Sequence, residues 1–231
     1  MTALPVSVQN SVLSLLPSAT LARLQPKLRH VHLKRHDLLQ EAQRPIDRVH
    51  FLQHGLAVLS ARTKRDGEVG VAIVGRFGVV GVTAVLGTMR SPHRCVMEVP
   101  GEALQIPTQD LRRAIDESPP LRQHLMHDVQ RLLIQNSQTA LCNARHSLEE
   151  RLARWLLLAQ DRLDRDTIPL THDFLSMMLG VRRAGVTTTL EQWEHGGAVR
   201  RTRGAVGIVN RAHLEQCACE CYRIIATEYQ A

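Results

Sequence analysis

The pattern of apolar and polar positions divides the chain into three parts. Short apolar alternations, interrupted by glycines, run from about Leu28 to Pro107 and are typical of strands. Apolar residues then recur every three to four positions from Leu121 to Ala140 without glycine or proline, which indicates one long helix. After Ser147 the apolar runs are short and separated by polar turns. This last part predicts a group of short helices.

The first part predicts a small antiparallel barrel or jelly roll, preceded by a helix over Val8 to Leu28. The turn pairs Asp66-Gly67 and Pro100-Gly101 separate candidate strands. We expect these strands at residues 49–52, 56–59, 69–74, 95–99 and 103–106.

The long helix has a clear start, because Ser118 can serve as its N-cap and Pro119 suits its first position. It should end at about Asn143. Its apolar stripe needs a partner, and a second copy of the same helix is the simplest one, with Asn136 fixing the register. The alternative is that the helix packs only on its own barrel. The candidate dimerisation residues are Leu121, Leu125, Val129, Leu132 and Asn136.

The third part contains a spacing typical of a helix-turn-helix. We expect helices at residues 148–164, 171–179, 182–194 and 211–228. Ser176 is followed by Gly180, which suits a tight turn with positive φ, and then by Val186, which can pack against the first helix. The second helix would expose its N-terminal part to base edges in a DNA groove. Its candidate DNA-binding residues are Arg182, Arg183, Thr187 and Thr188.

An extended stretch, Ala198 to Val209, follows this helix pair and has Gly204 at its centre. It predicts a hairpin, or wing, with a basic tip. Arg200, Arg201 and Arg203 would lie along the phosphates beside the groove and hold the protein in register.

Charge supports a polyanionic partner. The chain has 29 Lys and Arg against 22 Asp and Glu, a formal net charge of +7 at pH 7. Residues 148–231 are balanced, but the segment from Arg182 to Arg211 has six arginines and two glutamates. The few aromatic residues are scattered, which argues against single-strand binding by base stacking. Double-stranded DNA remains the expected partner.

A glycine-interrupted barrel, one long helix and a helix-turn-helix with a basic hairpin together resemble the Crp/Fnr family of bacterial transcription regulators. The resemblance runs from about Leu28 to Val209. It implies an α+β fold with a cyclic-nucleotide-binding-like β-roll sensor domain (1–115), a dimerisation helix (116–146) and a winged helix-turn-helix domain (147–231). It also implies a cytoplasmic homodimer on a palindromic promoter site. An unidentified small-molecule effector and RNA polymerase are further candidate partners.

The resemblance also indicates where an effector pocket would lie and how it departs from the family. Cyclic-nucleotide-binding members have a Gly-Glu segment that holds the ribose and a later Arg-Ser or Arg-Thr pair that holds the phosphate. The corresponding segment here has valine in place of the acid, and the later pair is Arg94-Cys95. An ordinary response to cyclic AMP is therefore not expected. The candidate pocket residues are Gly78, Val80, Gly81, Arg94 and Cys95.

The cysteines do not suggest a metal centre by their spacing. An iron–sulfur cluster of the Fnr type would need cysteines near the N-terminus, and the first is Cys95. On one continuous helix Cys217 and Cys221 would share a face and Cys219 would not. We therefore expect small buried hydrophobes, reduced thiols, no metal and no cofactor. Whether these cysteines or the twelve histidines sense metal or redox state stays open.

Two other functions are alternatives to a transcription regulator. A cupin-like metal-dependent enzyme could use His30, His32 and a carboxylate, but the spacing of acids after His32 fits poorly. An effector-binding module with a non-functional DNA domain is the second alternative. We expect no enzyme, because no other catalytic motif is present, and no membrane partner, because the apolar runs are short.

Overall fold

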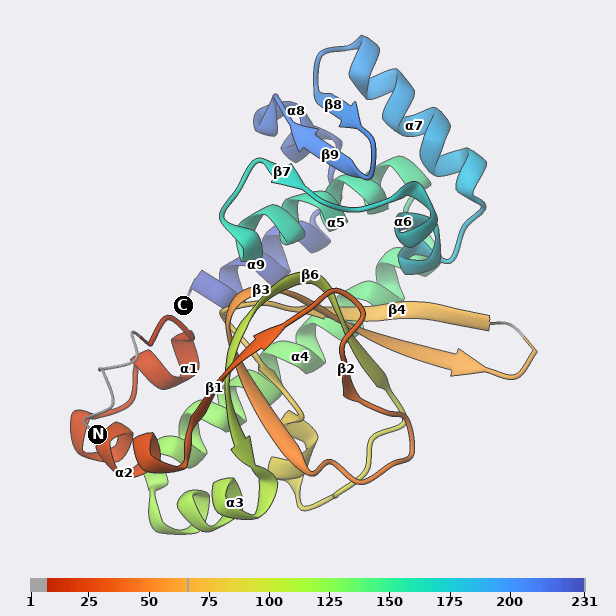
Figure 1. Cartoon of the computed structure of the whole chain (residues 1–231). Helices are drawn as coiled ribbons and strands as arrows, with labels where there is room; N and C mark the ends of the chain where they lie inside the picture. The colour runs from red at the N-terminus through yellow and green to blue at the C-terminus, as the bar shows by residue number, and fades with distance from the viewer. Residues whose placement is uncertain (1–7, 66, 231) are drawn as a thin grey trace. The chain divides into compact units, whose positions relative to one another are not determined.

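The computed structural model of the chain describes residues 8–65 and 67–230 (Figure 1). Two compact units are present, one formed by Met1–Leu59 with Val74–Gln130 and the other by Ser60–Ile73 with Arg131–Ala231. Residues 1–7, Asp66 and Ala231 lie outside the described residues, and so do the outer ends of the predicted domains and half of the predicted Asp66-Gly67 turn. An antiparallel sheet, one long helix and a C-terminal helix-turn-helix confirm the predicted α+β class.

The first unit is built on a sheet with the strand order β1-β6-β3-β4, in which β2 pairs with β6 and β5 with β3. β3 and β4 also carry the chain into the second unit and back. The strands are β1 (Arg29–Leu33), β2 (Leu38–Gln40), β3 (Arg48–Thr63), β4 (Gly67–Val74), β5 (Val79–Val80) and β6 (Arg94–Pro107).

The structure has two long strands, β3 and β6, where the sequence predicts four short ones. A Cβ on Gly101 would lie 2.1 Å from the carbonyl oxygen of His54, and one on Gly55 would lie 2.6 Å from that of Val99. These glycines therefore let β3 and β6 approach closely, and the backbone of Gly55 has φ +89°. The predicted turn at Pro100-Gly101 is wrong, because the strand continues through it.

The helices of this unit differ from the expectation at the N-terminus. The predicted single helix is interrupted at Pro17, which precedes the first residue of a second helix and has no N–H to continue the first. A third helix after β6 was not predicted. The helices are α1 (Ser11–Ser14), α2 (Ser18–Leu24), the 3₁₀ turns η1 (Gln25–Lys27) and η2 (Val82–Leu86), and α3 (Thr108–Glu117).

The long helix α4 (Pro119–Arg145) begins where the sequence predicts. The hydroxyl of Ser118 accepts a hydrogen bond from the N–H of Leu121 at 3.4 Å. Leu121 and Leu125 are fully buried within the first unit. They belong to the core of their own chain, so their prediction as dimer contacts is wrong.

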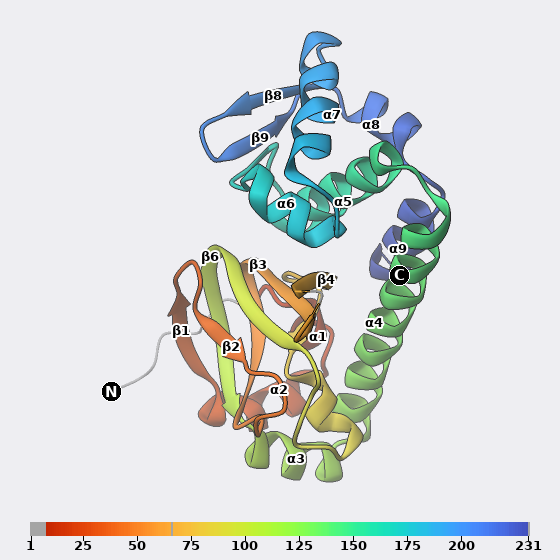
Figure 2. The same ribbon diagram turned by 90° about the vertical axis from the view of Figure 1, so that its right-hand side faces the viewer.

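The second unit holds the C-terminal helices, α5 to α9 (Figure 2), and a three-stranded sheet with the order β7-β9-β8. A capping box at Ser147 and Glu150 starts the first helix, as both side chains bond reciprocally to the backbone. The elements are α5 (Leu148–Leu163), β7 (Thr167–Ile168), α6 (His172–Leu179), α7 (Arg183–His195), β8 (Val199–Thr202), β9 (Ala205–Ile208), α8 (Arg211–Cys217) and α9 (Cys221–Gln230).

The last predicted helix, 211–228, is in fact two. Ala218 is extended, with φ −73° and ψ 141°, and this ends α8 three residues before α9 begins. The expectation that Cys217 and Cys221 share a helical face is therefore wrong. Within the described residues, no helix has the length and apolar character needed to cross a membrane.

Candidate nucleic-acid interface

Helices α6 and α7 form a helix-turn-helix around a left-handed glycine. Gly180 has φ +63°. The N–H of Val181 donates to the carbonyl of Ser176 at 3.0 Å and that of Gly180 to Met177 at 3.3 Å. This is the hydrogen-bond pattern of a Schellman C-cap, which any residue with a Cβ would strain. The turn is the one that the spacing predicts.

The predicted core of the pair is buried. Val186 and Leu190 of α7 are fully enclosed, as is Leu175 of α6. Gly185 has a packing reason, because a Cβ there would lie 2.8 Å from Cδ2 of Leu148 in α5. The glycine lets the first turn of α7 approach α5 closely.

The other face of α7 is open at its N-terminal end. Arg182 is the N-cap residue and makes no capping hydrogen bond through its side chain, and the first turn contains no acidic residue. Arg182, Arg183 and Thr188 are exposed. Arg183 Nε lies 3.4 Å from the carboxylate of Asp173, which is a solvent-exposed pair. A positive helix end with two arginines attracts anions.

Thr187 is less available than the other predicted contacts. It is half-buried, and its Oγ1 lies 2.9 Å from Nδ1 of His172. Burial, followed by the charges of Arg201 and Arg183, lowers the pKa of His172. The lowered pKa favours the neutral form of the imidazole beside the threonine.

The predicted wing is a hairpin of β8 and β9, with Thr202 paired to Ala205 and Val199 to Ile208. Gly204 in the two-residue loop has φ +77°. Val199 and Val206 bury one face, whereas Arg200 and Arg203 are exposed.

Arg201 has internal partners. Its backbone N–H donates to Glu194 at 2.7 Å, its Nε to Glu194 at 2.8 Å and its Nη1 to Glu191 at 2.9 Å. These hydrogen bonds lower the pKa of Glu194 and raise that of Arg201. The side chain joins the wing to α7, and neither glutamate was expected to take part from the sequence.

The predicted effector residues lie around β5 and the start of β6. Val80 is buried and pairs with His50 of β3, and Gly81 opens η2 with φ +89°. Arg94 is half-buried, with Nε 3.9 Å from Glu41. Cys95 is fully buried, and burial raises the pKa of its thiol. Gly78 is buried near Val74 and Asp128.

An Arg-Ser pair does occur, four positions before Arg94-Cys95, at Arg90-Ser91. Ser91 is buried, and its hydroxyl accepts a hydrogen bond from the N–H of His93 at 3.2 Å. Arg90 is exposed. Arg90-Ser91 therefore matches the family's Arg-Ser pair more closely than the predicted Arg94-Cys95 does. The glutamate of the family's Gly-Glu segment is absent in either case.

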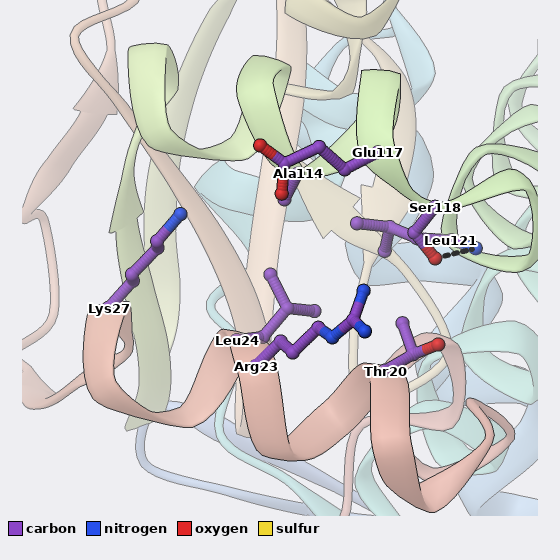
Figure 3. A pocket seen from close by; sticks show the side chains of 8 residues that line it. All are labelled: Thr20, Arg23, Leu24, Lys27, Ala114, Glu117, Ser118 and Leu121. Carbon is purple, nitrogen blue, oxygen red and sulfur yellow. Dashed lines mark hydrogen bonds between the residues drawn. The ribbon is translucent and has the colours of Figure 1, made fainter.

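A small pocket opens elsewhere in the first unit, between α2, α3 and the start of α4 (Figure 3). Arg23 and Lys27 come from one side, and Glu117 and Ser118 from the other (Figure 3). None of the predicted effector residues lines it.

The histidine pair and the C-terminal cysteines that the sequence offers as possible metal ligands have different surroundings in the structure. His30 and His32 both contact Glu102 of β6, at 3.0 and 3.2 Å, on the exposed surface. Cys219 and Cys221 are buried together with Cys142, which the sequence did not connect to them. Cys217 stays apart, with Sγ 3.5 Å from His213.

Comparisons with known families match both parts of the chain. Residues 30–118 match the model of the cyclic nucleotide-binding domain, and residues 150–217 match the Crp-like helix-turn-helix domain. Together the two models cover most of the chain, in the order that the fold shows.

Individual relatives and solved structures point to the same family as the two domain models. The chain is 25% identical over 182 residues to the global nitrogen regulator of Synechocystis sp., covering 74% of this chain and 80% of the relative. Its fold is similar to that of FixK2 from Bradyrhizobium japonicum (TM-score 0.73, 16% identity, 83% of this chain and 98% of that one). It is also similar to a Crp/Fnr-family regulator from Eubacterium rectale (TM-score 0.70, 16% identity, 90% and 98%). The chain belongs to the Crp/Fnr family of DNA-binding transcription regulators.

Proposed function

We propose that the protein acts as a homodimer that places α7 of each subunit in the major groove of a two-fold symmetric site in duplex DNA. The observation that carries this proposal is the exposed N-terminus of α7, where Arg182 and Arg183 adjoin a first turn that has no side-chain cap and no acidic residue. This end combines a positive helix dipole with two guanidinium groups that can bind guanine O6 and N7.

The roles of the α7 residues follow from their exposure. Arg182, Arg183 and Thr188 contact base edges directly, because they project from the exposed part of the helix. Thr187 contacts a base through its methyl group, since its hydroxyl is engaged by His172.

The wing binds phosphates. Arg200 and Arg203 are its exposed cations and contact the DNA backbone. Arg201, which we expected from the sequence to share this role, acts instead as the brace that fixes the wing against Glu191 and Glu194.

The dimer uses a stripe of α4 that its own chain leaves partly open. Met126 and Leu133 are exposed, and Val129 and Asn136 are half-buried. Together with Ala140 they follow alternating spacings of three and four residues, which is the seam of a coiled coil. Asn136 Oδ1 has no hydrogen-bond partner among the described residues. This atom is enclosed within its own chain, so Asn136 contributes to the seam by packing rather than through Oδ1.

The sensor domain does not bind cyclic AMP in the ordinary way. The β5 segment presents two buried valines, Val79 and Val80, and no carboxylate for a ribose hydroxyl. We assign an unidentified small-molecule effector to this domain, RNA polymerase as a partner on the promoter, a cytoplasmic location and no enzymatic activity.

Selection of bound duplexes from a random pool tests the proposal. We expect a two-fold symmetric consensus whose half-sites are about one helical turn apart, or a multiple of it. Selection of an asymmetric sequence, or no enrichment at any effector condition, would contradict it.

A further inference from the structure

Two pairs of side chains that lie more than 70 residues apart in the sequence converge inside the second unit. Sγ of Cys142, Cys219 and Cys221 and a ring nitrogen of His146 all lie within 4.8 Å of one another. The two sulfurs of Cys142 and Cys219 are 3.5 Å apart, and Sγ of Cys221 is 3.7 Å from Nδ1 of His146.

Local structure brings each pair together. Cys142 and His146 are four positions apart at the end of α4, where the N–H of His146 still donates to the carbonyl of Cys142 at 3.1 Å, so both side chains share a face. Cys219 lies in the link between α8 and α9, and the N–H of Tyr222 donates to its carbonyl at 3.0 Å. The break at Ala218 thus turns Cys219 toward Cys221.

The separations fit one tetrahedral ion. Zinc binds thiolate sulfur at about 2.3 Å and imidazole nitrogen at about 2.0–2.1 Å, so tetrahedral ligands lie about 3.8 Å apart for two sulfurs and about 3.6 Å for sulfur and nitrogen. The four irons of a cubic iron–sulfur cluster would hold their thiolates farther apart. Three cysteines and one histidine are also a usual ligand set of structural zinc.

Burial and charge agree with this chemistry. Cys142 and Cys221 are fully buried, and Cys219 is 6% exposed, so water would not take a ligand position. Three thiolates and Zn²⁺ leave one negative charge. Arg154 is 3% exposed, and its positive charge interacts with Cys142 and Cys221. Its Nε has no hydrogen-bond partner among the described residues. An anionic metal centre would offset this buried cation.

We propose that Cys142, His146, Cys219 and Cys221 form a closed, structural zinc site. The ion ties the last turn of α4 to the junction of α8 and α9. Since α5 packs on both α8 and α9, the site stabilises the helical layer of the second unit.

Metal analysis of the full-length protein, purified under reducing conditions from zinc-supplemented medium, tests the site. We expect about one zinc per chain. Replacement by Co²⁺ should give sulfur-to-cobalt charge-transfer absorption and the visible bands of tetrahedral cobalt. Stoichiometric iron with acid-labile sulfide, a metal-free protein that takes up no added Zn²⁺, or a Cys142–Cys219 disulfide in the reduced preparation would overturn the proposal.

Variants assign the ligands. Cys142→Ser and Cys221→Ser should lower the zinc content from about one to below about 0.2 per chain, and His146→Cys should retain tetrahedral cobalt absorption. Cys217→Ser is the matched control, because this thiol lies in the same segment but outside the cluster. Loss of zinc in Cys217→Ser, or full retention in Cys142→Ser, would contradict the assignment. If a serine variant fails to fold, His146→Cys still tests the site, because cysteine can take the place of histidine as a zinc ligand.

Discussion

Gly185 occupies the first half of α7, where helix propensity alone would favour alanine by nearly 1 kcal/mol. A steric contact opposes this preference in the folded protein, because a Cβ at this position would meet the end of the Leu148 side chain. A glycine that looks unfavourable in the isolated helix is thus explained by the packing of α7 on α5.

Gly185→Ala should change the stability of the protein little, because displacing the end of the half-buried Leu148 side chain offsets the gain in helix propensity of nearly 1 kcal/mol. In a Leu148→Ala background the same change should instead stabilise it by up to about 1 kcal/mol. Urea denaturation of the four proteins in this cycle measures the coupling. Equal effects of Gly185→Ala in both backgrounds would show that the two residues do not interact.

Arg200 and Arg201 are neighbours in the sequence with different surroundings. Arg200 is exposed, whereas Arg201 is held by Glu191 and Glu194. The sequence could not distinguish them, because both glutamates lie on α7 and meet the wing only after folding.

The salt dependence of DNA binding separates these two arginines. Arg200→Ala should reduce the slope of log K against log salt by roughly one unit, because one phosphate contact is lost. Arg201→Ala should weaken binding while leaving the slope unchanged, since the wing loses its brace. Arg223→Ala, on the exposed side of α9, is the control and should change neither quantity. A reduced slope for Arg201→Ala would restore it as a phosphate contact.

At the scale of elements, α4 shows what periodicity can and cannot reveal. Its apolar repeat predicts the helix correctly, but the repeat does not say which residues face the chain's own core. Leu121 and Leu125 do, whereas Met126 and Leu133 remain exposed. Because Leu121 and Leu125 are buried in the subunit, the proposed dimer seam lies part of a helical turn away from the predicted one, along Met126 and Leu133.

Leu133→Glu should dissociate the dimer, raising its dissociation constant at least about 100-fold, because a carboxylate would be buried in an apolar seam. Sedimentation velocity across a range of concentrations measures this change. Leu141→Glu, at another exposed leucine of the same helix, lies outside the stripe and should leave the dimer intact. A monomeric wild type, or dissociation in both variants alike, would contradict the seam.

The strands and the C-terminal helices show where local patterns fail. The glycines at Gly55 and Gly101 look like turn signals, but they serve the close approach of two continuous strands. The break at Ala218 has no glycine or proline to mark it. The spacing Cys142-x₃-His146 was the available sign of a ligand pair, but its partners lie over 70 residues away.

For the whole molecule, the sequence predicts the order of the domains and the helix-turn-helix well, because these depend on long periodic segments and on one glycine turn at Gly180. The candidate effector site would depend on a few polar residues, and the family's motif is only partly present, at Arg90-Ser91. The proposed function requires both parts, since in our proposal the sensor domain acts on transcription through a DNA-bound dimer.

The most direct measurement compares Arg183→Ala and Arg200→Ala on the selected site and on a set of duplexes with each base pair replaced in turn. Our account predicts that Arg183→Ala loses about 1–3 kcal/mol on the selected site and no longer discriminates at one position of each half-site. Arg200→Ala should weaken binding to all duplexes alike. If both variants lose the same affinity on every sequence, α7 does not read bases and the assignment of its exposed face is wrong.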